Sequence, residues 1–516
     1  MTFKPLQGAP LLVVGAGIMG TGIAQVAAQA GHAVMLFDLR EGAAAQAKAQ
    51  LARSLDALAA KGKLSAQDVA GTLERIEPIP SLDAAASVRL VVEAVVEKLD
   101  VKRSLLRQLE GIVGGDCVLA TNTSSISVTA IANGLQQPGR LVGMHFFNPV
   151  PLMRLVEVVS GLRTDAAVAQ AVHSLAGSWG KVAVHARSTP GFIVNRIARP
   201  YYAETLALLQ ERSAEPALLD ACLRAAGFRM GPCELMDLIG HDTNFAVTQS
   251  VFEANFFDKR FAPSLVQREL VDGGLLGRKS GRGFYDHAPG AVKPSVPAFE
   301  PMELPAETLL SVHGQGAVAR RLSDTLAAAG RGFEPVPDSD WVGLEIDGAQ
   351  LRLTDGRAAS QVGAGEVAEV VVFDLPLSRD GGAALSWAPA VQAGAAWVEA
   401  APRWLRALGF NAQRMADAPG LVVARTVAML INEAADAVHQ GVCDEAGADA
   451  AMKLGVNYPQ GPFEWLHRWG AAPVAALLDA LDAHYRGERY RVSPGLRMRA
   501  WQRGMVESQD CKGDVV

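Results

Sequence analysis

The chain has 516 residues and a formal net charge of −6; 49% of its residues are hydrophobic and 20% are charged. This composition is typical of a water-soluble globular protein of about three or four domains, and it offers no basic face for nucleic acid. The five cysteines are widely spaced and form no CxxC pair, which argues against a disulfide framework or a structural zinc site and favours the reducing cytoplasm.

The first candidate element is an apolar stretch, residues 5–37, without any charged side chain. Its length would suffice to cross a bilayer. Its several glycines and polar residues instead favour a buried strand at 11–14, a helix to about residue 30 and a second strand at 33–37. A signal peptide is not expected either, because the apolar run leads into a glycine turn rather than a cleavage site. We therefore expect no membrane segment here.

The turn between the first strand and the helix has the sequence GAGIMG. Gly15 would allow the tight turn, Gly17 the close approach of the backbone to a pyrophosphate, and Gly20 the packing of the helix on the strand. Ile18 and Met19 fall in the first turn of the helix, whose unpaired N–H groups attract phosphate. The turn therefore predicts a phosphate-binding loop.

Asp38 closes the second predicted strand, where a carboxylate can accept a hydrogen bond from the ribose 2′-hydroxyl of a dinucleotide. Strand, turn, helix, strand and acid in this order predict a dinucleotide site; the alternative is a glycine-rich turn without a ligand. The carboxylate would repel the 2′-phosphate of NADP and so favours NAD. Arg40, close behind, leaves NADP as the alternative.

Predicted strands and helices alternate after this unit. Strands are expected at 89–94 and 117–121, and helices at 41–61 and 100–110. Such alternation predicts a parallel sheet covered by helices, the doubly wound Rossmann arrangement, whose ligands bind at the carboxyl ends of the strands. The sequence NTSS, which begins at Asn122, and the region of Glu97 each follow a strand, so both should line the same crevice.

His145 and Glu157 are ionisable residues in apolar surroundings. Strands predicted at 140–146 and 154–159 are joined by a proline-containing turn, which brings the two side chains towards each other. A histidine titrates near neutral pH and can take a proton from an alcohol, and a carboxylate behind it would fix its tautomer. The alternative is a core histidine bonded to a backbone carbonyl. After a nucleotide motif, the catalytic interpretation is favoured.

Four motifs together resemble those of the 3-hydroxyacyl-CoA dehydrogenase family: GAGIMGTGIA, NTSSISVTAIA, HFFNPVPLMRLVEVV and STPGFIVNRI, in this order and spacing. The resemblance covers residues 8 to about 290. It implies a Rossmann domain followed by an all-α helical domain, NAD as the cofactor and a 3-hydroxyacyl-CoA as the substrate. A hydride would pass from C3 of the acyl chain to the nicotinamide, and such a transfer needs no metal; we find no metal constellation.

The resemblance also implies roles for four residues. His145 resembles the general base that takes the proton of the 3-hydroxyl, and Glu157 resembles its partner. Ser124, the first serine of TSS, resembles the residue that bonds the substrate oxygen, and Asn195 resembles the amide that orients the substrate. Alternatively, Ser124 caps a helix that starts near residue 126, and Asn195 is a packing amide.

Further residues match positions that contact the ligands in the family. The cofactor contacts so implied are Glu97, Lys102 and Asn122. The residues so implied for the acyl-CoA are Ser54 and Lys61, with Asn148 as a residue that supports the site or its turn. Lys61 has the alternative of a solvated lysine at a helix end.

The second half contains a repeat of the helical domain. The segment from Ser188 has a counterpart from Asp417, and GFRMGPCELMDLIG in the first half has one in GVNYPQGPFEWLHRWG. At the position of Asn195 the repeat has Ala424, whose methyl group cannot form a hydrogen bond. We therefore expect the second copy to be non-catalytic. It would pack on the first copy like a built-in partner.

The predicted domains are a NAD-binding Rossmann domain at 8–187, a helical domain at 188–287, a proline-rich linker at 288–305, a degenerate Rossmann-like domain at 306–400, and the second helical copy at 401–516. The GxGxxA sequence that begins at Gly314 is followed by a helix pattern, but no NTSS or HFFNPV equivalent follows. We expect this third domain to bind no cofactor.

The full-length pattern resembles the long bacterial form of the family that is linked to phenylacetate breakdown, which implies 3-hydroxyadipyl-CoA as the substrate. The runner-up is 3-hydroxybutyryl-CoA. A non-catalytic NAD-binding scaffold is an alternative of another class. We find no hydratase motif, which argues against a multifunctional β-oxidation enzyme. Neither nucleic acid nor a membrane is an expected partner, while a homo-oligomer is compatible with the sequence.

Overall fold

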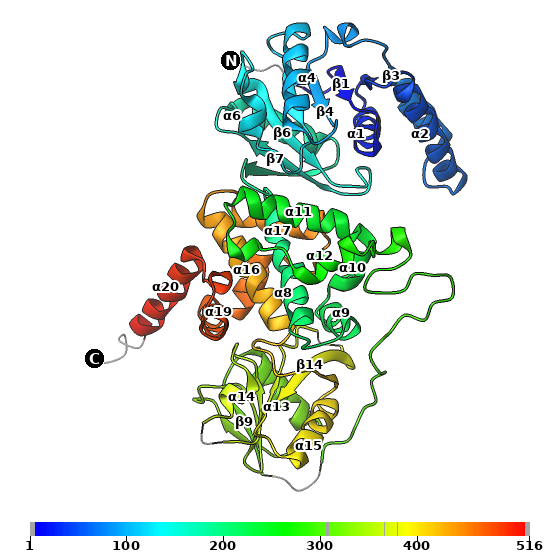
Figure 1. Ribbon diagram of the computed structural model, residues 1–516. Helices are drawn as coiled ribbons and strands as arrows, with labels where there is room; N and C mark the ends of the chain where they lie inside the picture. Colours follow the sequence, from blue (N-terminus) through cyan, green and yellow to red (C-terminus); the bar gives the residue numbers. More distant parts are fainter. Residues whose placement is uncertain (1–5, 306–308, 366, 379, 511–516) are drawn as a thin grey trace. The chain divides into compact units, whose positions relative to one another are not determined.

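The computed structural model describes residues 6–305, 309–365, 367–378 and 380–510 (Figure 1). The chain divides into two compact units. The first unit comprises residues 1–196 and 440–456, and the second comprises 197–439 and 457–516. The predicted start of the third domain, 306–308, and the end of the chain with Cys511 lie outside the described residues.

The first unit is built on an eight-stranded sheet with the order β3-β2-β1-β4-β5-β6-β7-β8. Its strands are β1 (Leu11–Val14), β2 (Val34–Phe37), β3 (Ile76–Pro78), β4 (Leu90–Glu93), β5 (Val118–Thr121), β6 (Leu141–Phe146), β7 (Leu155–Ser160) and β8 (Val182–Arg187). Every neighbouring pair is parallel except β6 and β7. The central strands are mostly apolar because helices cover both faces; the ionisable residues in them are Glu93, His145 and Glu157. This arrangement confirms the predicted Rossmann fold.

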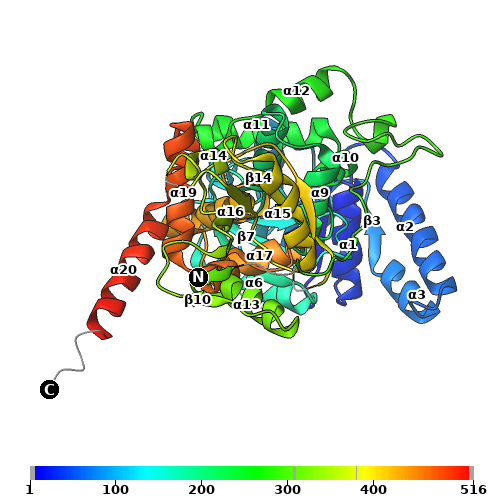
Figure 2. The same ribbon diagram turned by 90° about the horizontal axis from the view of Figure 1, so that it is seen from below.

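The helices of the first unit are α1 (Ile18–Gln29), α2 (Ala43–Ala60), α3 (Ala66–Glu74), α4 (Leu99–Ile112), α5 (Val128–Ala132), α6 (Ala166–Ser178) and α17 (Glu445–Gly455), with α7 (Val194–Ile197) at its end. The uncharged N-terminal stretch forms β1, α1 and β2, as predicted. Among the described residues no helix is long and apolar enough to cross a membrane. Figure 2 shows α2 and α3 side by side beyond β3, at the edge of the sheet.

Helix α17 was not expected in this unit, because the sequence assigns it to the second helical copy. It packs on β7 and β8. The contact at its end is close: a Cβ atom on Gly455 would lie 2.7 Å from Leu155 and 3.0 Å from Val194. The backbone N–H of Arg187 also donates to the carbonyl of Val442 at 2.8 Å. The second copy is therefore divided, and its segment 440–456 belongs with the Rossmann sheet.

The second unit contains the remaining helices of both copies. Copy 1 supplies α8 (Arg199–Gln210), α9 (Pro216–Ala225), α10 (Pro232–Ile239), α11 (His241–Ala254), the short η3 (Lys259–Phe261) and α12 (Leu265–Asp272). Copy 2 supplies α16 (Val423–His439), α18 (Pro462–Trp469), α19 (Ala471–Tyr485), the short η5 (Glu488–Tyr490) and α20 (Pro494–Asp510). Helix α20 packs on α16 and α19, and Figures 1 and 2 both show its C-terminal end extending away from them.

The two copies pack on each other through α8 and α16, the packing that the sequence analysis hypothesised. Helix α16 is buried from Val423 to Ala437. The aromatic ring of Tyr458 in copy 2 lies 5.0 Å from that of Phe228 in copy 1. The fused copy thus covers the apolar face that a lone helical domain would expose to water.

The second unit also contains a seven-stranded sheet with the order β10-β9-β11-β12-β13-β14-β15. Its strands are β9 (Leu310–His313), β10 (Glu334–Val336), β11 (Gly343–Ile346), β12 (Ala349–Leu353), β13 (Val370–Phe373), β14 (Ala383–Pro389) and β15 (Phe410–Arg414), with helices α13 (Ala317–Ala328), α14 (Ala359–Val362) and α15 (Ala395–Ala407). Strands β9 and β10, which are connected through α13, pair in parallel, but β11 runs antiparallel to β9. The sheet is a reduced Rossmann arrangement, and β15 extends it past the predicted boundary at 400.

Candidate active site

The turn between β1 and α1 has the geometry that its glycines predict. Gly15 has φ +103°, and a Cβ atom there would lie 2.5 Å from the carbonyl oxygen of Ala94. A Cβ atom on Gly20 would collide with the carbonyl oxygen of Gly15, whereas nothing lies within 4 Å of a Cβ atom on Gly17. Open space therefore lies above the first turn of α1, where Ile18 is 78% exposed while Met19 packs against the core. No side chain caps this helix, so its first N–H groups can receive phosphate.

Asp38 lies against this turn. Its Oδ2 accepts the backbone N–H of Ala16 at 2.8 Å, and its Oδ1 accepts the backbone N–H and the Nε–H of Arg40 at 3.0 and 3.1 Å. Burial raises the pKa of Asp38, but the hydrogen bonds from Arg40 and Ala16 outweigh it, and the pKa falls below its ordinary value. The carboxylate is therefore ionised beside the phosphate turn. Arg40 already pairs with it, which favours NAD over NADP.

A buried polar cluster lies at the carboxyl ends of β4 and β5, and the sequence analysis missed it. Glu93, the last residue of β4, is fully buried. One carboxylate oxygen accepts the ammonium of Lys102 at 2.5 Å and the backbone N–H of Val95 at 3.0 Å, and the other accepts the hydroxyl of Thr121 at 2.8 Å. An acid at the end of an apolar strand is the signal that could have indicated it, since buried carboxylates need partners.

Lys102 is predicted to contact the cofactor, but its side chain is only 1% exposed. Its ammonium group is bound to Glu93 and lies 3.2 Å from a carboxylate oxygen of Glu97. Glu97, at 36% side-chain exposure, is the member of this cluster that faces outward. Lys102 therefore pairs with Glu97 from the buried side, and Glu97 is the residue that faces outward.

Glu97 organises the loop that follows β5. Its Oε1 accepts the hydroxyl of Thr123 at 2.5 Å and the backbone N–H groups of Ser124 and Ser125 at 3.0 and 3.1 Å. Burial raises the pKa of Glu97, but the charge of Lys102 and these hydrogen bonds lower it below its ordinary value. The backbone of Ser124 is thereby fixed, while its half-buried hydroxyl forms no hydrogen bond with another described residue. The helix-cap alternative for Ser124 is wrong: Ser127 caps α5.

His145 and Glu157 face each other across the antiparallel strands β6 and β7. The Nδ1 atom of the histidine lies 2.5 Å from Oε2 of the glutamate. His145 is 5% exposed and Glu157 is fully buried. A buried carboxylate on Nδ1 leaves Nε2 as the nitrogen that can take up a proton. The histidine is thus paired with an acid and not with a backbone carbonyl, so the core-histidine alternative is wrong as it was formulated.

The second oxygen of Glu157 holds the turn that leads into α7. Its Oε1 accepts the backbone N–H groups of Ile193 and Val194, both at 3.0 Å. Asn195 is the next residue and is half-buried in the first turn of α7. One carboxylate therefore connects the imidazole of His145 with the backbone that carries Asn195.

Aromatic and amide groups surround this pair. The rings of Phe147 and Phe192 lie 4.5 and 5.7 Å from the imidazole of His145, which limits the access of water. Asn122 accepts the backbone N–H of Phe146 through Oδ1 at 2.9 Å and so braces β6 beside the histidine. Asn148 is exposed in the turn between β6 and β7, where it precedes a cis-proline.

The structure does not bring Ser54 and Lys61 into this group. Both are exposed, Ser54 on α2 and Lys61 at its C-terminal end. The hydroxyl of Ser54 donates to the carbonyl of Gln50 at 3.1 Å. Within the part of the chain that the structure describes, no hydrogen bond or ion pair joins either residue to the histidine pair, so their contact with CoA stays a prediction.

The second sheet carries an altered counterpart of the histidine pair. Asp374 directly follows β13 and lies opposite Ser386 of β14, so Asp374 stands in the place of His145 and Ser386 in that of Glu157. The fully buried Asp374 accepts the Ser386 hydroxyl at 2.7 Å, the backbone N–H of Leu375 at 2.8 Å, and those of residues 422, 423 and 424 at 2.9, 2.7 and 2.9 Å. The carboxylate still holds the turn before the helix, but the imidazole and the Asn195 amide are both absent from these positions.

Comparisons with known proteins agree with this division. A family model described as "3-hydroxyacyl-CoA dehydrogenase, NAD binding domain" matches residues 11–189, and one described as "3-hydroxyacyl-CoA dehydrogenase, C-terminal domain" matches 191–287 and 420–509. A third, "3-hydroxybutyryl-CoA dehydrogenase reduced Rossmann-fold domain", matches 351–419. The C-terminal model thus matches both of the helical segments that the sequence repeat relates.

Individual relatives support the same assignment. The chain is 43% identical to 3-hydroxyadipyl-CoA dehydrogenase of Escherichia coli K12, over 96% of this chain and 98% of the relative. It is 42% identical to a probable 3-hydroxybutyryl-CoA dehydrogenase of Deinococcus radiodurans, over 53% of this chain and 99% of the relative. A crystal structure of 3-hydroxybutyryl-CoA dehydrogenase from E. coli K12 superposes with a TM-score of 0.86 at 42% identity and covers 96% of this chain and 98% of that one.

Proposed function

Because the chain belongs to the 3-hydroxyacyl-CoA dehydrogenase family, whose members oxidise 3-hydroxyacyl-CoA with NAD, we propose that His145 is the general base of this oxidation. The observation that carries the proposal is the 2.5 Å contact between Nδ1 of His145 and the buried Glu157. The carboxylate keeps Nδ1 protonated in the resting enzyme, so Nε2 has a free lone pair. It also stabilises the imidazolium that forms when Nε2 takes the proton of the 3-hydroxyl.

The reaction balances with few groups. NAD, when bound, accepts the hydride from C3. The C3–H bond breaks with its electron pair, and the O–H proton moves to Nε2 of His145, so C3 and its oxygen become the carbonyl of a 3-oxoacyl-CoA. The imidazolium later releases the proton to solvent. The aromatic rings of Phe147 and Phe192 keep water from the imidazole, which strengthens its interaction with Glu157.

Ser124 and Asn195 are proposed to bind the reacting part of the substrate. The hydroxyl of Ser124 makes no hydrogen bond with another described residue, and Glu97 fixes its backbone. It can therefore donate to the substrate oxygen without first breaking an internal bond. Asn195 is positioned by Glu157 through the preceding residue, so the amide and the base are set by one carboxylate.

The proposed cofactor contacts are the turn of Gly15, Gly17 and Gly20 for the pyrophosphate, and Asp38 for the ribose. Glu97 and Asn122, at the carboxyl ends of neighbouring strands, lie where the nicotinamide half is expected in this fold. Lys102 acts through Glu97, whose charge it balances. Four described cysteines, Cys117, Cys222, Cys233 and Cys443, are free thiols, which supports the reducing cytoplasm as the compartment.

We propose 3-hydroxyadipyl-CoA as the substrate, since the relative with that name is similar over nearly the whole of both chains. 3-Hydroxybutyryl-CoA is the second candidate, because the similar crystal structure carries that name. The test is NADH formation by the purified protein with NAD and the adipyl, butyryl or hexanoyl form of the 3-hydroxyacyl-CoA. The proposal expects the highest kcat/KM with the adipyl form. A higher kcat/KM with the butyryl form would overturn it, and NAD binding without oxidation of any form would favour a scaffold.

A further inference from the structure

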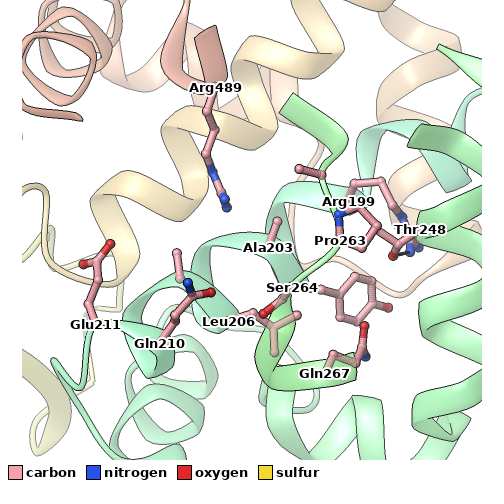
Figure 3. A pocket seen from close by; sticks show the side chains of 13 residues that line it. Arg199, Ala203, Leu206, Gln210, Glu211, Thr248, Pro263, Ser264, Gln267 and Arg489 are labelled. Atoms are coloured by element: carbon pink, nitrogen blue, oxygen red, sulfur yellow. Dashed lines mark hydrogen bonds between the residues drawn. The ribbon is translucent and has the colours of Figure 1, made fainter. Parts of the chain in front are cut away.

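The second unit contains a cavity of about 220 Å³ between the two helical copies (Figure 3). Copy 1 supplies most of its lining, from α8, α11 and the start of α12. Copy 2 supplies Arg489, whose guanidinium group reaches towards α8. The other polar side chains of the lining are Arg199, Tyr202, Gln210, Glu211, Thr248, Ser264 and Gln267. None of these residues belongs to the Rossmann sheet or to the histidine pair.

The repeat provides an internal reference for this cavity. Glu204 and Arg260 of copy 1 have Glu433 and Arg489 of copy 2 as counterparts, at one constant spacing in the sequence. Arg489 binds Glu204 through Nε and Nη2 at 3.1 and 3.0 Å, and Arg260 binds Glu433 through Nη1 at 3.2 Å. Each copy thus provides an arginine that binds the glutamate of the other copy. Such reciprocal contacts are typical of a two-fold symmetric interface.

The two sides of this interface differ in one respect. Arg260 binds a second carboxylate, that of Asp436 on α16, at 3.1 Å. The counterpart of Asp436 on α8 is Ala207, and Ala207 lines the cavity. On the copy 2 side the arginine therefore has two carboxylate partners, whereas on the copy 1 side a methyl group stands where the second carboxylate would be.

A second replacement enlarges the cavity in the same way. Asn432 of α16 donates to the carbonyl of Arg491 at 3.0 Å and accepts the backbone N–H of Ser493 at 2.7 Å. Its counterpart on α8 is Ala203, which also lines the cavity. Two alanines thus stand where copy 2 has an amide and a carboxylate that fill the corresponding space.

The charge of the cavity is shifted towards positive as well. Arg199, which lines it, has Ala428 as its counterpart; it is buried, donates to the hydroxyl of Thr248 at 3.0 Å and lies 4.9 Å from the centre of the Tyr202 ring. Glu204 also binds Arg425 at 2.9 Å, so one carboxylate serves two guanidinium groups. Glu211, also in the lining, accepts the hydroxyl of Tyr485 at 3.0 Å. Compared with its counterpart, the cavity has gained the cation of Arg199 and lost the carboxylate of Asp436. It has also gained the carboxylate of Glu211, whose counterpart is the neutral Gln440, so its net formal charge is still more positive.

We propose that this cavity binds a small organic carboxylate. The carboxyl group of this ligand pairs with Arg489 in the way that the carboxylate of Asp436 pairs with Arg260. Guanidinium groups bind carboxylates with directional, charge-assisted hydrogen bonds. The amide and hydroxyl groups of Gln210, Gln267 and Ser264 can receive a polar end of the same molecule. Because the ligand would bridge the two copies, its binding adds stability to the folded second unit.

The test measures binding to the full-length protein by calorimetry and by the shift of the unfolding temperature. The probes are succinate and butyrate, with neutral succinamide and inorganic phosphate as references. We expect succinate or butyrate to bind and to raise the unfolding temperature, and succinamide and phosphate to bind at least about tenfold more weakly. Equal binding of phosphate would overturn the carboxylate assignment. No binding of either carboxylate at about 10 mM, roughly tenfold above a weak Kd of 1 mM, would overturn the site.

Two variants locate the binding. Ala207→Asp installs the carboxylate that copy 2 has, so it should weaken carboxylate binding at least about tenfold, a difference of about 1.4 kcal/mol. Asp436→Ala opens the corresponding space beside Arg260 and should create a second carboxylate site, seen as a higher stoichiometry. Circular dichroism checks that both variants are folded. If Ala207→Asp does not fold, the stoichiometry of Asp436→Ala still tests the proposal. Unchanged affinity in the first variant, or unchanged stoichiometry in the second, contradicts the proposal.

Discussion

Glu157 binds Nδ1 of His145 with one carboxylate oxygen at 2.5 Å and the backbone N–H groups of Ile193 and Val194 with the other at 3.0 Å. The residue that orients the proposed base therefore also holds the turn that carries Asn195. The functions proposed for His145 and Asn195 therefore depend on a single buried side chain, which makes its replacement informative.

Glu157→Gln should separate these two functions. The glutamine oxygen can still accept the backbone N–H groups, but its NH₂ group would donate to Nδ1 and leave the proton on Nε2. We expect kcat to fall by about 10²- to 10⁴-fold while the unfolding temperature stays close to that of the wild type. Steady-state kinetics and a thermal melt on the same preparation check this. A loss of less than about threefold would show that the tautomer of His145 does not matter.

Asp38→Ala should weaken the preference for NAD. The carboxylate is ionised because the hydrogen bonds with Arg40 and Ala16 lower its pKa, and its removal takes away both the acceptor for the ribose hydroxyls and the repulsion of a 2′-phosphate. We expect the ratio of kcat/KM for NAD to that for NADP to fall by about tenfold or more, about 1.4 kcal/mol. The measurement compares both cofactors at saturating acyl-CoA, with Arg40→Ala as the matched control. An unchanged ratio would contradict the assigned role.

Glu97 should make stability depend on pH in the acid range. Its folded-state pKa lies below the ordinary value, so the stability it contributes is complete above its unfolded pKa and disappears as the pH falls through the folded pKa. Glu97→Gln should therefore lower the unfolding temperature at neutral pH, and the difference from the wild type should shrink as the pH falls below about 4.3. Melting curves between pH 3 and 7 test this; a difference that grows in acid would have the wrong sign.

Asp374→Ala should destabilise the second unit without removing a catalytic group. The substitution leaves the backbone N–H groups of residues 422 to 424 and the Ser386 hydroxyl without their common acceptor. Leaving a buried donor unsatisfied costs about 1–3 kcal/mol, so we expect the free energy of unfolding to fall by about 3 kcal/mol or more. Urea titration measures it, with Asp380→Ala, at an exposed position in the loop between β13 and β14, as the control. A change below about 1 kcal/mol would show that the turn holds itself.

The parts that could be predicted from the sequence are those that local patterns determine. GAGIMG and Asp38 belong to one continuous βαβ unit, and their geometry follows from the glycines. His145 and Glu157 lie on strands joined by a short turn, so their pairing needed only the hairpin and its register. The helical repeat was visible because its Pro-Gly turns and apolar spacing are alike in both copies.

The rest depends on contacts that no local pattern records. The pairing of Glu93 with Lys102 needs the packing of α4 on the sheet, and without it Lys102 resembles a ligand contact. The transfer of α17 to the first unit involves partners more than 250 positions apart, such as Arg187 and Gln440. In the second sheet the carboxylate, Asp374, stands in the place of His145, and Ser386 stands in the place of Glu157. This exchange becomes visible only when the register of β13 and β14 is known.

The central claim is that His145 takes the proton of the 3-hydroxyl, and one measurement tests it most directly: the rate of NADH formation in a single turnover by His145→Gln and by the wild type, with 3-hydroxyadipyl-CoA and saturating NAD. The account predicts that the rate falls by about 10²-fold or more while the affinity for NAD, measured separately by calorimetry, stays unchanged. A variant that reduces NAD as fast as the wild type would contradict it.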